Sequence, residues 1–293
     1  MLTPDPVAAT SLVDRPAPSP VPAPRSAYWL FYREVAAAQL AAWLPRQPAR
    51  VLDLSGPAGF AGELVASGHE VVLVRDRPDD AEVVVDGPGR VLPVLADSRS
   101  LTWLADASVD LVLAESRVLS MCLAAEVTVE QLAGALRPGG RLLLTVDSLG
   151  LGLARLADQG RWAELADVPS ADVVLVPDDD GSITRCFWPE ELHALLGAAG
   201  LEVDWVRPRS VLSPATVERA LEQGGRAALR TLVQTEVALA QERQGEATGL
   251  HLVASARRPG PTTAQPPAAS NFSWSATQRA ASGRTSRRAS GIG

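Results

Sequence analysis

The chain has 293 residues, of which 46% are hydrophobic, so it can bury a full core as one large domain or two small ones. Its formal net charge is −7 and its isoelectric point is about 5.1. A surface that binds nucleic-acid phosphates needs clustered cations, so this balance argues against nucleic-acid binding as the main function. A small-molecule or protein substrate is favoured.

The two cysteines, Cys122 and Cys186, lie in apolar stretches and belong to no CxxC or Cys/His pattern. This is typical of reduced thiols in a core, so we expect no metal site. The start of the chain lacks a basic region followed by an apolar run, and no run of 18 uncharged apolar residues occurs. We therefore expect a cytoplasmic protein without a membrane span.

Residues 1–25 are rich in Pro, Ala and Ser without any period, so neither a helix nor a strand ladder can propagate through them. We expect a disordered arm there. Ser26 can cap a helix over 27–44, whose apolar residues follow a helical stripe. The aromatic start of this helix, 28–32, indicates core packing, with a lid over a ligand as the alternative.

The stretch 51–62, VLDLSGPAGFAG, organises the predicted fold. Its apolar start is typical of a buried parallel strand, Gly56 and Gly59 then break regular pairing, and a helix runs from Phe60 to its stop at Gly68. A strand, glycine turn and helix present free backbone N–H groups at the edge of a sheet. This arrangement suits a nucleotide-like ligand.

Asp53 lies just before this turn, and a second apolar run over 70–76 ends in Arg75 and Asp76. With these residues the chain resembles the class I S-adenosylmethionine-dependent methyltransferases. In that family an acid precedes a glycine-rich turn, and the second strand ends in an acid that binds the ribose hydroxyls. Here Arg75 stands at the usual place of that acid, and Asp76 follows one residue later.

The resemblance implies that S-adenosylmethionine is the cofactor and that the residues of this first motif contact it: Asp53, Ser55, Gly56, Gly59 and Asp76. Aligned without a gap, Ser55 and Pro57 stand where the family motif has its first two glycines, and Gly59 matches the third; aligned with a one-residue deletion, Gly56 matches and Ala58 replaces the third glycine. We expect the backbone at Gly59 to approach the cofactor, so that Gly59→Val would block binding while the fold survives.

Two further strands are predicted to end in candidate site residues. The strand over 90–96 is followed by Asp97 and Ser98, and the resemblance implies that an acid here faces the adenine amino group; a helix N-cap is the alternative for Asp97. The strand over 109–114 is followed by Glu115, at the point where strand order reverses and ligands bind in open α/β sheets.

Arg117 and Asp147 lie at the ends of neighbouring predicted strands, where cofactor and substrate would meet, with solvated strand-end polar residues as the alternative interpretation. No general base stands out. His69, His193 and His251 are each interpreted as structural. We therefore assign no catalytic residue from the sequence.

The Arg-Pro-Gly-Gly turn at 137–140 is a second resemblance to the family, because it ends one helix and starts the fifth strand. The remaining predicted elements are a helix over 149–166, a hairpin of 173–176 with 182–187, a helix from 188, strands over 201–206 and 251–256, and insert helices over 214–244. The insert would shape a substrate pocket, form a homodimer contact or cover the surface.

We thus predict an α/β fold: a Rossmann-like, mostly parallel seven-stranded sheet with helices on both faces. One methyltransferase-like domain spans 26–258, and a disordered basic tail follows over 259–293. The predicted function is methyl transfer to a small molecule, which needs mainly in-line placement of the acceptor. A degenerate binding or scaffold protein is the alternative; a nicotinamide-dependent oxidoreductase is disfavoured because Gly-x-Gly-x-x-Gly is absent.

Overall fold

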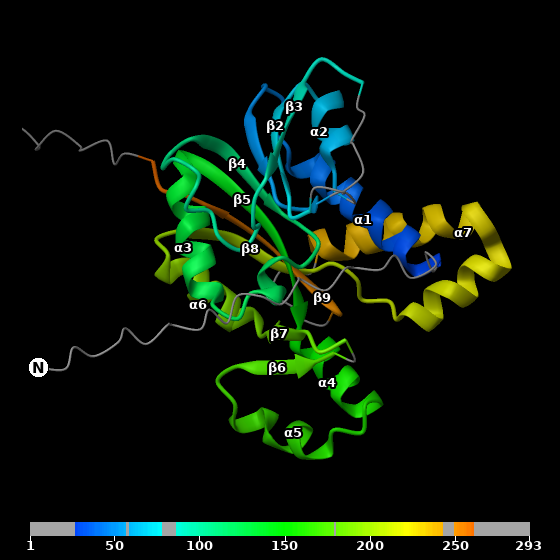
Figure 1. The fold of residues 1–293 in the computed structure, drawn as a ribbon. Helices are drawn as coiled ribbons and strands as arrows, with labels where there is room; N and C mark the ends of the chain where they lie inside the picture. Colours follow the sequence, from blue (N-terminus) through cyan, green and yellow to red (C-terminus); the bar gives the residue numbers. More distant parts are fainter. Residues whose placement is uncertain (1–26, 57–58, 78–85, 179, 243–248, 261–293) are drawn as a thin grey trace, which may run out of the picture. The chain divides into compact units, whose positions relative to one another are not determined.

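The computed structural model describes residues 27–56, 59–77, 86–178, 180–242 and 249–260 (Figure 1). The predicted arm at 1–25 and the predicted tail, apart from its first two residues, lie outside the described residues. Pro57 lies outside them as well.

In the described part of the chain, nine strands form one sheet. They are β1 (Arg50–Asp53), β2 (Glu70–Arg75), β3 (Arg90–Leu95), β4 (Val109–Ala114), β5 (Leu136–Ser148), β6 (Val174–Pro177), β7 (Ile183–Phe187), β8 (Glu202–Pro208) and β9 (His251–Arg257).

The sheet runs in the order β3-β2-β1-β4-β5, with every neighbouring pair parallel. β9 pairs antiparallel with β5, and β8 pairs antiparallel with β9. The chain returns from β3 to β4 on the other side of β1, so strand order reverses between β1 and β4. This confirms the α/β, Rossmann-like, mostly parallel fold. In open α/β sheets, the carboxyl ends of the two strands at such a reversal are where ligands bind.

The predicted count of seven strands is too low for this sheet. The hairpin of β6 and β7 joins it, because β7 pairs in parallel with the last two residues of β5, Asp147 and Ser148. The Asp-Gly turn signal predicts the hairpin itself. It carries no information about which strand the hairpin adds to.

Helices cover both faces of the sheet. They are α1 (Ala27–Trp43), α2 (Ala61–Ala66), α3 (Ala125–Ala135), α4 (Leu149–Asp158), α5 (Trp162–Asp167), α6 (Pro189–Ala198) and α7 (Pro214–Glu242), with short 3₁₀ turns η2 (Leu119–Met121) and η3 (Val168–Ser170). The helix predicted over 149–166 is two helices, because Gly160 takes a left-handed φ of 66° between them. α7 bends at Gly225.

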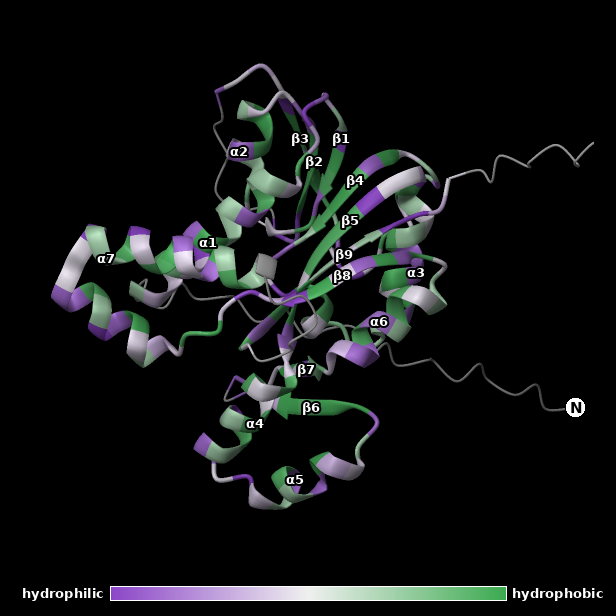
Figure 2. Ribbon diagram, turned by 180° about the vertical axis from the view of Figure 1, so that it is seen from behind, coloured by the Kyte–Doolittle hydropathy of each residue, from purple (hydrophilic) through white to green (hydrophobic). Residues whose placement is uncertain are grey.

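Strand β4 shows how the two faces are filled. Leu111 and Leu113 pack with residues of α1 and α2, whereas Val112 and Ala114 pack with residues of α3 and α6. Alternate side chains therefore enter opposite layers, as expected of a strand buried on both faces, and Figure 2 colours β4 mostly hydrophobic.

The predicted insert forms α7, which packs along α1 (Figure 1). Tyr28, Phe31 and Val35 of α1 are buried together with Val217 of α7. The apolar side of α7 is thus covered within the chain. None of the described helices is both long enough and apolar enough to cross a membrane.

Candidate functional site

The turn after β1 holds a buried carboxyl group with spare hydrogen-bonding capacity. The Asp53 side chain is fully buried, and its Oδ1 accepts a hydrogen bond from the Ser55 N–H at 2.9 Å. Asp53 Oδ2 and Ser55 Oγ are buried without a hydrogen-bond partner among the described residues. Burial raises the pKa of Asp53 to about 6, against the opposing effect of the hydrogen bond from the Ser55 N–H.

Gly56 leaves this turn open on one side. Its φ of +67° lies in the left-handed region, and among the described residues, its chain neighbours aside, no atom lies within 4 Å of the position that a Cβ would occupy. A ligand can therefore approach the backbone at Gly56 closely, while the left-handed conformation disfavours most other residues there.

Gly59 is packed closely against the turn. A Cβ at Gly59 would lie 2.8 Å from Ser55 Cβ and 2.9 Å from the Gly56 carbonyl oxygen, and the Gly59 N–H donates to that same oxygen at 3.0 Å. The expectation that Gly59→Val would only fill the path of a ligand is wrong, because the side chain would collide with the turn itself.

The structure brings Asp76 and Ser98 together. Asp76 follows β2, and its two carboxylate oxygens accept from the Ser98 N–H at 2.8 Å and from Ser98 Oγ at 3.1 Å. The side chain of Asp97 instead accepts from Arg99, and these hydrogen bonds lower the pKa of Asp97. Asp76 therefore holds the segment after β3 in place by two hydrogen bonds, and Asp97 forms an exposed ion pair with Arg99.

Glu115, at the end of β4, is buried in an ion pair that the sequence analysis missed. Arg209 donates from both terminal nitrogens to the two Glu115 carboxylate oxygens, one of these bonds measuring 2.8 Å. Thr145 Oγ1 also donates to Glu115 at 2.7 Å, and Gln39 accepts from Arg209 Nε at 2.8 Å. Both oxygens of Glu115 are thus engaged within the chain.

The loop after β4 carries two left-handed residues that are not glycine, Ser116 with φ 61° and Arg117 with φ 64°. Ser116 Oγ donates to the Ser55 carbonyl oxygen at 3.1 Å, which ties this loop to the turn after β1. Backbone strain of this kind clusters at functional sites.

Beyond this loop, Arg117 forms an ion pair with Asp147 at 2.9 Å, and Asp147 Oδ1 lies 3.0 Å from His251 Nδ1. The sequence analysis placed Arg117 and Asp147 at this edge but interpreted His251 as structural. The only sequence signal for His251 was its position at the start of the last predicted strand, which the structure places beside Asp147 at the end of β5.

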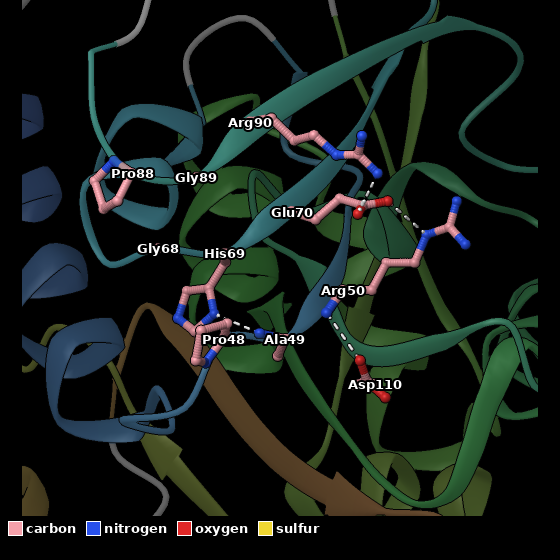
Figure 3. A pocket seen from close by; sticks show the side chains of 10 residues that line it. All are labelled: Pro48, Ala49, Arg50, Gly68, His69, Glu70, Pro88, Gly89, Arg90 and Asp110. Atoms are coloured by element: carbon pink, nitrogen blue, oxygen red, sulfur yellow. Dashed lines mark hydrogen bonds and ion pairs between the residues drawn. The ribbon is translucent and has the colours of Figure 1, made fainter.

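A separate cavity of about 410 Å³ lies at the opposite edge, at the amino ends of β1 to β4 (Figure 3). Glu70 bridges Arg50 and Arg90, at 3.2 and 2.6 Å. His69 is buried beside it, and its Nδ1 accepts from the Ala49 N–H at 3.1 Å; burial lowers the pKa of His69. None of the predicted site residues lines this cavity.

The polar side chains at the carboxyl edge do not gather into a metal centre. Among the described residues, no group of three or more His, Cys, Asp and Glu side chains could hold a metal ion. Cys122 and Cys186 are buried free thiols, and burial raises the pKa of both.

No protein-family model matches the sequence, and no curated protein matches it. Solved structures do match in fold. A SAM-dependent methyltransferase from Methanosarcina mazei superposes with a TM-score of 0.51 at 16% identity, over 76% of this chain and 98% of that one.

Two other matches are weaker in superposition. The 1,6-didemethyltoxoflavin-N1-methyltransferase from Burkholderia thailandensis, solved with its substrate and S-adenosylhomocysteine, has a TM-score of 0.47 at 20% identity, over 79% of this chain and 81% of that one. An S-adenosylmethionine-dependent methyltransferase from Mesorhizobium loti has a TM-score of 0.46 at 16% identity, over 80% of this chain and 99% of that one. The strand order and the superposition on the Methanosarcina mazei structure show that the chain has a Rossmann-like α/β fold, which that methyltransferase shares.

Proposed function

We propose that this protein is an S-adenosylmethionine-dependent methyltransferase that acts on a small molecule. The observation that carries the proposal is the turn after β1, where the backbone of Gly56 is open to a ligand and two buried oxygens, Asp53 Oδ2 and Ser55 Oγ, have no partner among the described residues. Orphaned polar atoms at the carboxyl edge of this fold are what a bound nucleoside cofactor would satisfy.

The residues that would hold the cofactor are those that the sequence predicts at this edge: Asp53, Ser55, Gly56, Gly59, Asp76, Asp97, Ser98 and Glu115. Their parts differ. Asp53, Ser55 and Gly56 offer direct contacts, Gly59 closes the turn, and Asp76 holds Ser98 in place. When bound, the cofactor supplies an electrophilic methyl group; the chain contributes placement and exclusion of water.

The same contacts favour one alternative, a binding or scaffold protein without transfer activity. Asp97 is paired with Arg99, and Glu115 accepts hydrogen bonds from Arg209 and Thr145. Both acids therefore already have partners within the chain, which a structural role alone would explain. Methylated product with any acceptor would exclude this alternative.

We further propose that 26–258 is the functional domain, that the protein works in the cytoplasm, and that its partner is a small molecule and not nucleic acid or a membrane. The acidic net charge supports the choice against nucleic acid. A homodimer through α7 stays a proposal, to be checked by the mass in solution.

The experiment that tests the proposed function is calorimetric titration of the full chain with S-adenosylmethionine, S-adenosylhomocysteine and NAD. We expect one site for the first two and none for NAD. Binding of NAD without binding of either sulfur compound would overturn the proposal.

A further inference from the structure

A buried carboxylate and a histidine form a hydrogen-bonded pair at the carboxyl edge of the sheet. Asp147, near the end of β5, is fully buried, and its partner across the strands is His251, the first residue of β9, which is 3% exposed. Asp147 Oδ1 lies 3.0 Å from His251 Nδ1. The Asp147 backbone N–H donates to Ser120 Oγ at 2.8 Å, which helps to fix its position.

This contact determines which nitrogen of His251 is free. A carboxylate only accepts hydrogen bonds, so Nδ1 carries the hydrogen in this assignment and Nε2 carries the lone pair. Arg117 Nε lies 2.9 Å from the same oxygen, Oδ1 of Asp147. Arg117 and Asp147 thus lie on the Nδ1 side of the ring, and Nε2 is the ring nitrogen that can take up a proton in this tautomer.

Aromatic rings of α1 surround this imidazole. The Tyr32 ring lies 5.0 Å from the His251 ring with an edge-on geometry, and the Trp29 ring lies 6.4 Å from it. Trp29 and Tyr32 also contact each other at 5.3 Å. Trp29 is 40% exposed, so the aromatic cluster reaches the surface at Trp29, while the imidazole of His251 is buried. Flat aromatic molecules stack well on such rings.

The other ionisable groups around His251 are less suited to accept a proton. Tyr32 faces it from α1, Asp147 from β5, Arg117 from the loop after β4, and Arg209 lies over the Tyr32 ring at 5.6 Å. Burial raises the pKa of Tyr32, so its hydroxyl keeps its proton at neutral pH. The arginines are already protonated. His251 Nε2 is left as the group suited to act as a base.

We propose that His251, oriented by Asp147, is the general base of the reaction and that the acceptor is a planar hydroxyarene bound beside Trp29. The inference rests on the proposed methyltransferase function and names its substrate class. Asp147 is a positioning residue in this account, because it acts through His251.

The step balances as follows. The acceptor O–H bond breaks and its proton passes to His251 Nε2, while the oxygen forms a bond to the methyl carbon. The bond between that carbon and sulfur breaks with its electron pair going to sulfur, which gives an aryl methyl ether and S-adenosylhomocysteine. The proton on His251 leaves to solvent after the product departs.

The test uses 7-hydroxycoumarin, whose absorption spectrum distinguishes the phenol from the phenolate. The full chain is saturated with S-adenosylhomocysteine, and the probe is added at a pH below its own pKa. We expect the bound probe to show the phenolate band. His251→Gln and Asp147→Asn should lose most of this band, whereas His193→Gln, at an exposed histidine of α6, should keep it.

Affinity, followed by fluorescence of the same probe, separates binding from proton transfer. Trp29→Ala should weaken binding without changing the phenolate fraction of what remains bound. Where the probe is methylated, His251→Gln should slow turnover about 100-fold, the lower range for a positioned base.

Three results would overturn the inference: no binding of the probe to a chain that binds S-adenosylhomocysteine, a bound probe that stays neutral in the wild type, or an unchanged spectrum in a folded His251→Gln variant. The wild-type spectrum decides even if a variant fails to fold. Failure of the proposed function is a different outcome, because the chain would then not bind S-adenosylhomocysteine in the calorimeter.

Discussion

Arg209 and Glu115 lie 94 residues apart in the chain and form an ion pair in which neither side chain reaches solvent. Arg209 is also one of the largest fully buried side chains among the described residues. The pair joins the segment after β8 to the end of β4, at the strand where order reverses. It therefore holds the segment after β8 against the carboxyl end of β4.

Removing one partner of this pair should be costly, because the other charge would stay buried without compensation. We expect Arg209→Met to lower the free energy of unfolding by about 3–5 kcal/mol, measured by urea denaturation. The matched control is Arg257→Gln, which breaks the exposed pair with Glu202 and should leave the free energy of unfolding almost unchanged. Equal losses in the two variants would contradict this account.

The two glycines of the turn should respond differently to substitution. Gly56→Asn should keep the fold and lower the free energy of unfolding by about 1 kcal/mol. Asparagine tolerates a left-handed backbone, and the new side chain enters open space. Gly59→Ala should cost about 1–3 kcal/mol, because its methyl group would overlap the turn. Thermal melting of both variants checks this; a Gly59→Ala protein as stable as the wild type would refute the packing argument.

The buried carboxyl of Asp53 should make stability depend on pH. Its pKa in the folded chain is about 6, against 3.8 for an ordinary aspartate, so the fold favours the neutral form. That stabilising effect is complete below pH 3.8 and is lost as pH rises through 6. The full effect is at most about 3 kcal/mol, at 1.36 kcal/mol per pKa unit.

Asp53→Asn removes this dependence, since an amide cannot ionise and its oxygen can still accept from Ser55. Relative to the wild type, the variant should be more stable at pH 7.5 than at pH 4.5, as measured by denaturant midpoints. Glu34→Gln, at an exposed acid of α1, serves as the control. A relative stability of Asp53→Asn that does not change with pH would count against the buried, neutral carboxyl.

Asp76 and Ser98 should behave as one unit. Asp76→Ala removes both hydrogen bonds between them, whereas Ser98→Ala removes only the bond from Oγ and keeps the one from the backbone N–H, so Asp76→Ala should weaken binding of S-adenosylhomocysteine more. The double variant should add little to Asp76→Ala alone, which calorimetry can measure as a double-mutant cycle. Additive losses would show that the two side chains act separately on the ligand.

The strands were predictable because each carries a local signal. β1, β2 and β4 are short apolar runs, and the Arg-Pro-Gly-Gly turn marks the start of β5. The break between α4 and α5 was missed because Gly160 within a periodic helical stretch does not by itself end a helix.

The partners of the site residues were not predictable. Sequence position placed Glu115 and Asp147 at the correct edge of the sheet, but each side chain is engaged by a residue about a hundred positions away: Arg209 is 94 residues from Glu115, and His251 is 104 residues from Asp147. Such pairing depends on how the segments after β8 and before β9 pass over the sheet. No periodicity of the sequence records that path.

The most direct test of the central claim is a calorimetric titration with S-adenosylhomocysteine that locates the site on one edge of the sheet. The account predicts one site per chain in the wild type, weaker binding in Gly56→Asn at the carboxyl edge, and unchanged binding in Arg90→Gln at the amino-edge cavity. Unchanged binding in a folded Gly56→Asn protein together with lost binding in Arg90→Gln would place the ligand at the opposite edge and contradict the account.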